Sequence, residues 1–231
     1  MASTKEIQNR IKSIKDTMKI TNAMYMISSS KLKKAKKDLE NTEPYFYTLQ
    51  VSLARLLRHL PDMDLYFENE DDEKKENPKR GYIVVTADKG MAGAYNHNII
   101  KIAEEELANH PDSELYVVGQ VGRHYFARKN VPVDIHFQYT AQNPSLHRAR
   151  VIADKMLENY ESGKIDEVYI IYTKMINSVT AEPEMIQLLP FRKMDFKISQ
   201  ADVYHEEIII EPSPRAVMDR IVPNYITGFI H

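Results

Sequence analysis

The sequence predicts an α/β fold in which a mixed or mainly parallel sheet follows a long N-terminal helix. Two observations support this class. Apolar residues recur at alternating steps of four and three over the first sixty residues, which is the period of a coiled-coil helix. After residue 80, short apolar runs rich in β-branched residues alternate with helical patterns, which is typical of strands and helices in an α/β sheet.

The long helix is predicted over about residues 4–60, because the heptad spacing does not slip between Ile7 and Leu60. Ser3 and Glu6 form a capping-box pattern at its start, and Pro44 predicts a bend or a break just before it. At 1.5 Å per residue the helix is about 85 Å long, so we expect it to project and to need a partner strand. The alternative is a helix folded back on its own domain. The coiled-coil seam is predicted to contain Ile7, Ile11, Ile14, Met18, Leu32 and Leu39.

The predicted domain order is a coiled-coil helix at 1–60, a charged and mobile linker at 61–80, an α/β domain at 81–211 and the start of another helix at 212–231. Ser145 and Ser213 are predicted helix N-caps, the second followed by Pro214. Within the α/β domain we expect strands at 81–86, 115–119, 167–177, 185–190 and 208–210, with the third and fourth paired as a hairpin, and helices at 98–109, 121–129 and 145–160.

Composition excludes several classes of protein. The chain has no Cys, which rules out disulfides, thiolate zinc sites and cysteine catalysis. There is no apolar run long enough for a transmembrane helix, and the polar N-terminus lacks the apolar core of a signal peptide. The net charge of −2 is uneven, because residues 1–40 carry ten basic and four acidic groups and therefore +6. An acidic partner, either nucleic acid or a protein surface, is one explanation; a solvated charged face is the other.

Few residues indicate chemistry. Asp88, Gly90 and Gly93 follow the first predicted strand, where backbone amides at a helix start could face a phosphate. Their spacing matches neither the dinucleotide fingerprint nor the phosphate loop, and a tight structural turn explains them more simply. The eight His residues show no metal-ligand spacing. The basic helix resembles a basic-region leucine zipper only loosely. A nucleotide-binding α/β enzyme and a coiled-coil adaptor remain the alternatives.

Four segments, in order along the whole chain, resemble one family: the gamma subunit of F-type ATP synthases, the central rotor stalk. TADKGMAGAYN resembles the family's D-R-G-L-C-G-x-Y-N segment, although Lys89 replaces the usual Arg and Ala92 the usual Cys. VGQVGRHYF resembles its G-x-K-G-x-x-Y-F segment, and EPSPRAVMDRIVPNY its E-P-S-P opening of a second long helix. The fourth is the first-helix signature, RIKSIKDTMKITNAMYMISSSKLKKA at residues 10–35.

The resemblance implies an antiparallel coiled coil of N- and C-terminal helices carrying a Rossmann-like domain. It implies a non-catalytic rotor that couples proton-driven rotation of the membrane ring to ATP synthesis or hydrolysis, without a cofactor. The implied partners are the alpha and beta subunits of the catalytic head, the epsilon subunit and the membrane c-subunit ring, with no nucleic acid and no transmembrane segment of its own. The residues expected to contact the head are Lys19, Thr21, Met24, Ser28, Lys31 and Lys34.

The resemblance also implies a location, and the sequence differs from the family pattern at its C-terminal end. A peripheral position on the cytoplasmic face of a bacterial plasma membrane is expected. The chain ends at His231, where the family's C-terminal helix has barely begun, so we expect a fragment or truncated form of such a subunit.

Overall fold

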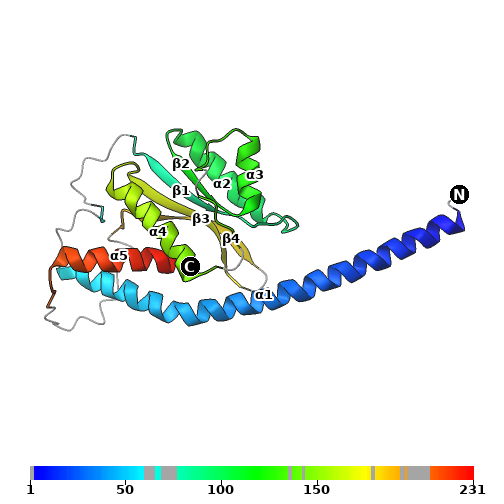
Figure 1. Cartoon of the computed structure of the whole chain (residues 1–231), viewed down its shortest axis with the longest axis horizontal. Helices are drawn as coiled ribbons and strands as arrows, with labels where there is room; N and C mark the ends of the chain where they lie inside the picture. Colours follow the sequence, from blue (N-terminus) through cyan, green and yellow to red (C-terminus); the bar gives the residue numbers. More distant parts are fainter. Residues whose placement is uncertain are drawn as a thin grey trace. The chain divides into compact units, whose positions relative to one another are not determined.

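The computed structural model describes residues 3–59, 66–68, 77–134, 137–141, 144–177, 180–192, 196 and 209–231 (Figure 1). The chain divides into two compact units, Met1–Tyr47 and Thr48–His231. The division falls inside the first helix, so the last turns of that helix belong with the α/β unit. In those turns Leu53, Ala54 and Leu56 are buried.

Helix α1 spans Thr4–His59, which confirms the long helix predicted from the heptad pattern. It begins where the carbonyl of Ser3 accepts hydrogen bonds from the backbone N–H groups of Glu6 and Ile7, at 2.8 and 3.1 Å. The helix continues through Pro44, so a break before this residue was the wrong alternative. The first glycine of the chain is Gly81, and the absence of earlier glycines favours one uninterrupted helix.

Four strands form one mixed sheet in the order β2-β1-β3-β4. Strand β1 (Arg80–Val85) lies between β2 (Glu114–Val118) and β3 (Glu167–Met175) and is parallel to both. Strand β4 (Ala181–Leu189) pairs antiparallel with β3 over Val168–Met175. The predicted hairpin is therefore confirmed, and its second strand begins four residues earlier than the apolar run indicated.

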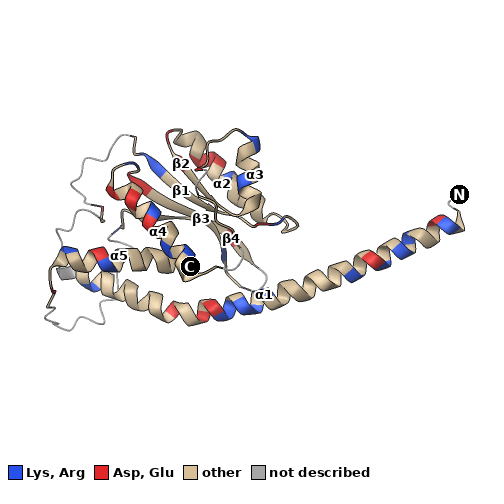
Figure 2. Ribbon diagram, in the orientation of Figure 1, with Lys and Arg blue, Asp and Glu red and all other residues tan. Residues whose placement is uncertain are grey.

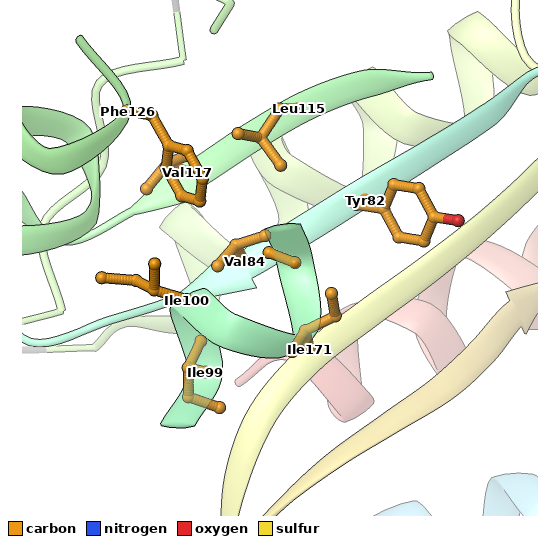
Figure 3. Packing of buried hydrophobic residues seen from close by; sticks show 9 residues of the cluster. Tyr82, Val84, Ile99, Ile100, Leu115, Val117, Phe126 and Ile171 are labelled. Carbon is orange, nitrogen blue, oxygen red and sulfur yellow. The ribbon is translucent and has the colours of Figure 1, made fainter. Parts of the chain in front are cut away.

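Helices cover both faces of this sheet (Figure 1). Helices α2 (Tyr95–Asn109) and α3 (Gln120–Arg128) follow β1 and β2, and they pack on one face. Figure 3 shows the core between them and the sheet, in which alternate strand residues point to the helices. The buried residues of this core are Tyr82, Val84, Ile99, Ile100, Ala103, Leu115, Val117, Phe126 and Ile171.

The opposite face is covered by α4 (Leu146–Glu161) and α5 (Pro214–Ile230), which also pack on each other. Both predicted caps are confirmed: Ser145 Oγ accepts from the Arg148 N–H, and Ser213 Oγ accepts from the Ala216 N–H. An edge-to-face contact between Phe229 of α5 and Tyr172 of β3 joins this helix to the sheet, with ring centroids 6.1 Å apart.

Two expectations of the sequence differ from the structure. Ile209 and Ile210 form no strand, and Ile209 is 85% exposed; Ile208 lies outside the described residues. A run of three Ile has strand propensity, but a strand also needs a neighbour to bond with. Most of the predicted linker at 61–80 also lies outside the described residues. Phe67, which falls inside this predicted mobile linker, is buried and forms a β-bridge with Phe191.

Candidate functional site

The first candidate surface is the N-terminal part of α1, whose apolar side chains are not covered by the described chain. The six predicted seam residues all lie on this helix and are 46–66% exposed: Ile7, Ile11, Ile14, Met18, Leu32 and Leu39. Seam side chains of this size normally lie against a partner helix. The exposed seam thus indicates a surface made for association.

The six residues predicted to contact a partner are also exposed on α1. At about 100° per residue, Met24, Ser28 and Lys31 share one face because they are spaced i, i+4 and i+7. Lys19 lies on the opposite side from Ser28, nine residues away, and pairs with Asp16 at 3.6 Å. The helix therefore places part of the predicted set together and Lys19 apart from it.

Between Lys19 and Lys31, α1 carries eleven consecutive uncharged residues, 20–30, which we call the neutral belt. Figure 2 shows it as an uninterrupted tan stretch of the helix. Met24, Tyr25 and Met26 are 43%, 73% and 70% exposed, and consecutive residues point about 100° apart. Large apolar side chains therefore project on every side of the helix, not along one stripe.

Five residues of the neutral belt are polar, namely Thr21, Asn22, Ser28, Ser29 and Ser30, but large apolar side chains on all sides of a helix still favour enclosure by other protein. The neutral belt is about 16 Å long at 1.5 Å per residue, and Ile20 and Ile27, at 62% and 57% exposure, add to its apolar surface. Basic residues border it on both sides, beginning with Lys19 and Lys31. Its geometry fits a surrounding apolar surface flanked by polar or acidic groups.

The second candidate is the turn between β1 and α2, which contains Asp88, Gly90 and Gly93. Asp88 Oδ1 accepts a hydrogen bond from the Gln120 N–H at the start of α3, at 3.2 Å. Gly93 has a φ of +56° and Met91 a φ of 63°, a conformation that favours Gly and is uncommon for Met. Met91 is 90% exposed. The Asp88 carboxylate therefore stabilises the start of α3 in the same chain.

Beneath this turn, Thr86 at the end of β1 forms hydrogen bonds to β2 and to α3. Its side chain is fully buried, its Oγ1 donates to the carbonyl of Val118 at 3.0 Å, and it accepts from the Gly122 N–H at 3.0 Å. Gly119 has a φ of +92°, and a Cβ there would lie 2.1 Å from the Thr86 carbonyl oxygen. Asn96 adds a bond from the Ala87 N–H to its Oδ1 at 2.8 Å.

Several buried or half-buried tyrosines pair with carboxylates in the α/β unit. The Tyr82 hydroxyl donates to Glu106 at 2.7 Å, and the Tyr172 hydroxyl to Glu184 at 3.0 Å. Burial, the hydrogen bonds and the nearby negative charge favour the neutral phenol. They raise the pKa well above the ordinary tyrosine value for Tyr66, Tyr82, Tyr116, Tyr169 and Tyr172.

In the described ranges, no group of three or more His, Asp or Glu side chains is arranged to hold a metal ion. None of the helices in those ranges combines the length and apolarity of a bilayer crossing. The sequence reasoning missed Thr86, Asn96 and Gly119, although their positions just after strands and at the start of α2 were visible.

Comparisons with known proteins agree on one family. A family model described as ATP synthase matches residues 3–231. The ATP synthase gamma chain of Ruminiclostridium cellulolyticum is 40% identical over 98% of this chain and 78% of its own length. That of Acetivibrio thermocellus is 40% identical over 100% and 80%. The fold also matches a Tetrahymena thermophila mitochondrial ATP synthase structure of the central stalk and c-ring, with a TM-score of 0.66, 22% identity and coverage of 91% and 89%.

Proposed function

The chain belongs to the ATP synthase gamma family and is a stalk subunit of the F-type rotor, and we propose that its neutral belt is the part of the shaft that turns inside the catalytic head. The observation that supports this is the belt's geometry. Exposed Met24, Tyr25 and Met26 project in three directions from one helix, as expected of a shaft that meets a different neighbour at each angle.

The chemistry of the belt fits repeated making and breaking of contacts. Met side chains are flexible and adapt to surfaces of different shape, and the belt contains no charge that would have to be desolvated at each step. The lysines on either side remain available for acidic groups of the head. Exposed ion pairs contribute less than about 1 kcal/mol each, so they do not hold the shaft at one angle.

The proposed partners follow from this role. The alpha and beta subunits surround the belt, and the α/β unit meets the epsilon subunit and the c-subunit ring. The exposed seam packs against a second long helix of the stalk. We place the assembled subunit at the cytoplasmic face of a bacterial plasma membrane, coupled to protons. The chain itself forms and breaks no covalent bond, and it transmits torque to catalytic sites on other subunits.

The experiment that tests this role introduces a charge into the belt. In the assembled enzyme, Met24→Lys is expected to lower the ratio of ATP made to ions moved, because a lysine must be desolvated whenever it turns past an apolar neighbour. Thermal stability of the isolated chain should change little, since Met24 is exposed and lies outside the main seam. Coupling is measured in membrane vesicles as ATP synthesis and ATP-driven ion pumping.

The matched control is Asn9→Lys, which adds the same charge to an exposed position of α1 outside the belt. It should leave coupling at the parent level. Equal coupling in the two variants would show that the belt is not the contact with the head. A loss of stability in Met24→Lys with coupling retained would instead assign Met24 to a packed face.

A further inference from the structure

Strand β4 is an edge strand of the sheet, because the strand order is β2-β1-β3-β4. In the part of the chain that the structure describes, no strand pairs with its outer edge, and Phe67 bridges to Phe191 beyond the end of β4. An edge strand presents main-chain N–H and C=O groups to which another strand can bond, and proteins block such edges with Pro or charged side chains. β4 contains both, as Glu182, Pro183 and Glu184.

The pairing with β3 decides which main-chain groups of β4 face outward. In an antiparallel ladder, hydrogen-bonded and non-hydrogen-bonded pairs alternate. In the hairpin, the Ile176 N–H donates to the Thr180 carbonyl at 3.0 Å, and every second pair from there on is hydrogen-bonded. The main-chain groups of Glu182 and Glu184 therefore face β3. The residues whose main-chain groups face the open edge are Ala181, Pro183 and Met185.

Pro183 lies at the centre of this edge and removes one of its donors. Proline has no N–H, so only Ala181 and Met185 offer a donor to a strand that approaches from outside. Proline is tolerated in an edge strand where its nitrogen faces away from the ladder, which is its position here, opposite Thr173. An added strand would leave the carbonyl that faces Pro183 without a donor.

We propose that Pro183 and the glutamates on either side of it prevent β4 from pairing with the β4 edge of a second copy of this chain. In a two-fold antiparallel arrangement centred on Pro183, the proline faces its own copy, so both hydrogen bonds of the central pair are absent. Glu182 of one copy lies opposite Glu184 of the other, with Cβ atoms about 4.5–5.5 Å apart, and like charges at this spacing are destabilising.

The carboxylates are only partly neutralised within one copy. Lys174 Nζ lies 3.5 Å from Glu184 Oε2, and the Tyr172 hydroxyl donates to the same oxygen at 3.0 Å. Glu182 is exposed, and β4 contains no basic residue. Two-fold pairing would gather four glutamates and two lysines on one face, a net charge of −2. The edge thus opposes self-pairing through charge as well as through the missing donor, whatever the function of the chain.

Amide exchange of the full chain tests the open edge before any substitution. The Met185 amide should exchange at close to the unprotected rate, because it faces outward, whereas the Glu184 amide should be protected by its bond to β3. Protection of Met185 in the parent chain would show that the edge is already covered, and it would overturn the proposal.

Substitution tests the block itself. Pro183→Thr supplies the missing donor in each copy, and because one main-chain hydrogen bond is worth about fivefold in an equilibrium constant, association through this edge should tighten about 25-fold. Adding Glu182→Thr removes the facing like charges and should tighten it further. In the double variant, protection of the Met185 amide should rise with protein concentration, which also separates this contact from any association through the seam of α1.

The matched control is Pro111→Thr, which makes the same substitution in the exposed turn between α2 and β2. Its Met185 amide should exchange as in the parent chain at every concentration. If the double variant behaves like this control up to its solubility limit, Pro183 and Glu182 do not prevent pairing. Should the double variant fail to fold, the exchange of Met185 in the Pro183→Thr single variant decides.

Discussion

Replacing Thr86 by Val tests the hydrogen bonds beneath the β1–α2 turn, because Val keeps the shape of Thr and has a methyl group in place of the hydroxyl. The Thr86 side chain is fully buried, and its loss leaves the Gly122 N–H unpaired, which costs about 1–3 kcal/mol. The Val118 carbonyl keeps the Thr86 N–H at 2.9 Å, so losing its second bond, from Thr86 Oγ1, costs only about a further 1 kcal/mol. The added methyl group recovers about 0.8 kcal/mol. We therefore expect the free energy of unfolding to fall by about 2 kcal/mol.

The matched variant is Thr86→Ser, which keeps the hydroxyl and deletes the methyl group, at a cost of about 1 kcal/mol. Urea unfolding followed by near-ultraviolet circular dichroism suits the comparison, because the chain has fourteen Tyr and no Trp and the buried tyrosines report on the α/β unit. With a slope of about 2 kcal/mol per molar urea, Thr86→Val should shift the midpoint down by about 1 M. If Val proves as stable as Ser or more so, the hydrogen bonds of Thr86 do not hold this turn.

Two further predictions concern the same unit. Gly119→Ala should lower the free energy of unfolding by at least about 3 kcal/mol, because its Cβ would lie 2.1 Å from the Thr86 carbonyl oxygen and its backbone is left-handed. The control is Gly90→Ala, which has open space around its Cβ. Equal urea midpoints for the two variants would contradict the close approach at Gly119. The raised pKa of buried tyrosines such as Tyr116 means that the folded chain holds these protons to higher pH than the unfolded chain. Stability should thus be complete below about pH 10 and fall above it, and phenolate absorbance rising well before loss of structure would refute this.

The sequence alone predicted the elements that depend on local pattern. The heptad run without Gly placed α1 to within about one residue, and Ser145 and Ser213 marked two helix starts through their own side-chain bonds. The residues that it missed act through non-local contacts. Thr86 is informative only once β2 and α3 lie beside it, and Phe67 only once Phe191 does. Ile209 and Ile210 were read as a strand because propensity reports side-chain shape and not the presence of a neighbouring strand.

The candidate surfaces divide in the same way. The seam and the neutral belt can be recognised from the spacing of apolar and charged residues, because both lie along a single helix. The seam, the head-contact residues and the domain boundaries stay predictions, because their partners are other segments or other chains. The hydrogen bond from Tyr82 of β1 to Glu106 of α2 joins residues 24 positions apart, and no spacing rule predicts it.

The neutral belt has a mechanical consequence because charges border it at both ends. Inside an apolar sleeve, a rotation of α1 leaves Lys19 and Lys31 at their own heights, outside the sleeve. An axial slip of one heptad, about 10 Å, would instead draw one of these lysines into the apolar surround at a cost of several kcal/mol. In the proposed arrangement, the same eleven residues thus leave the helix free to rotate and oppose its sliding along its axis.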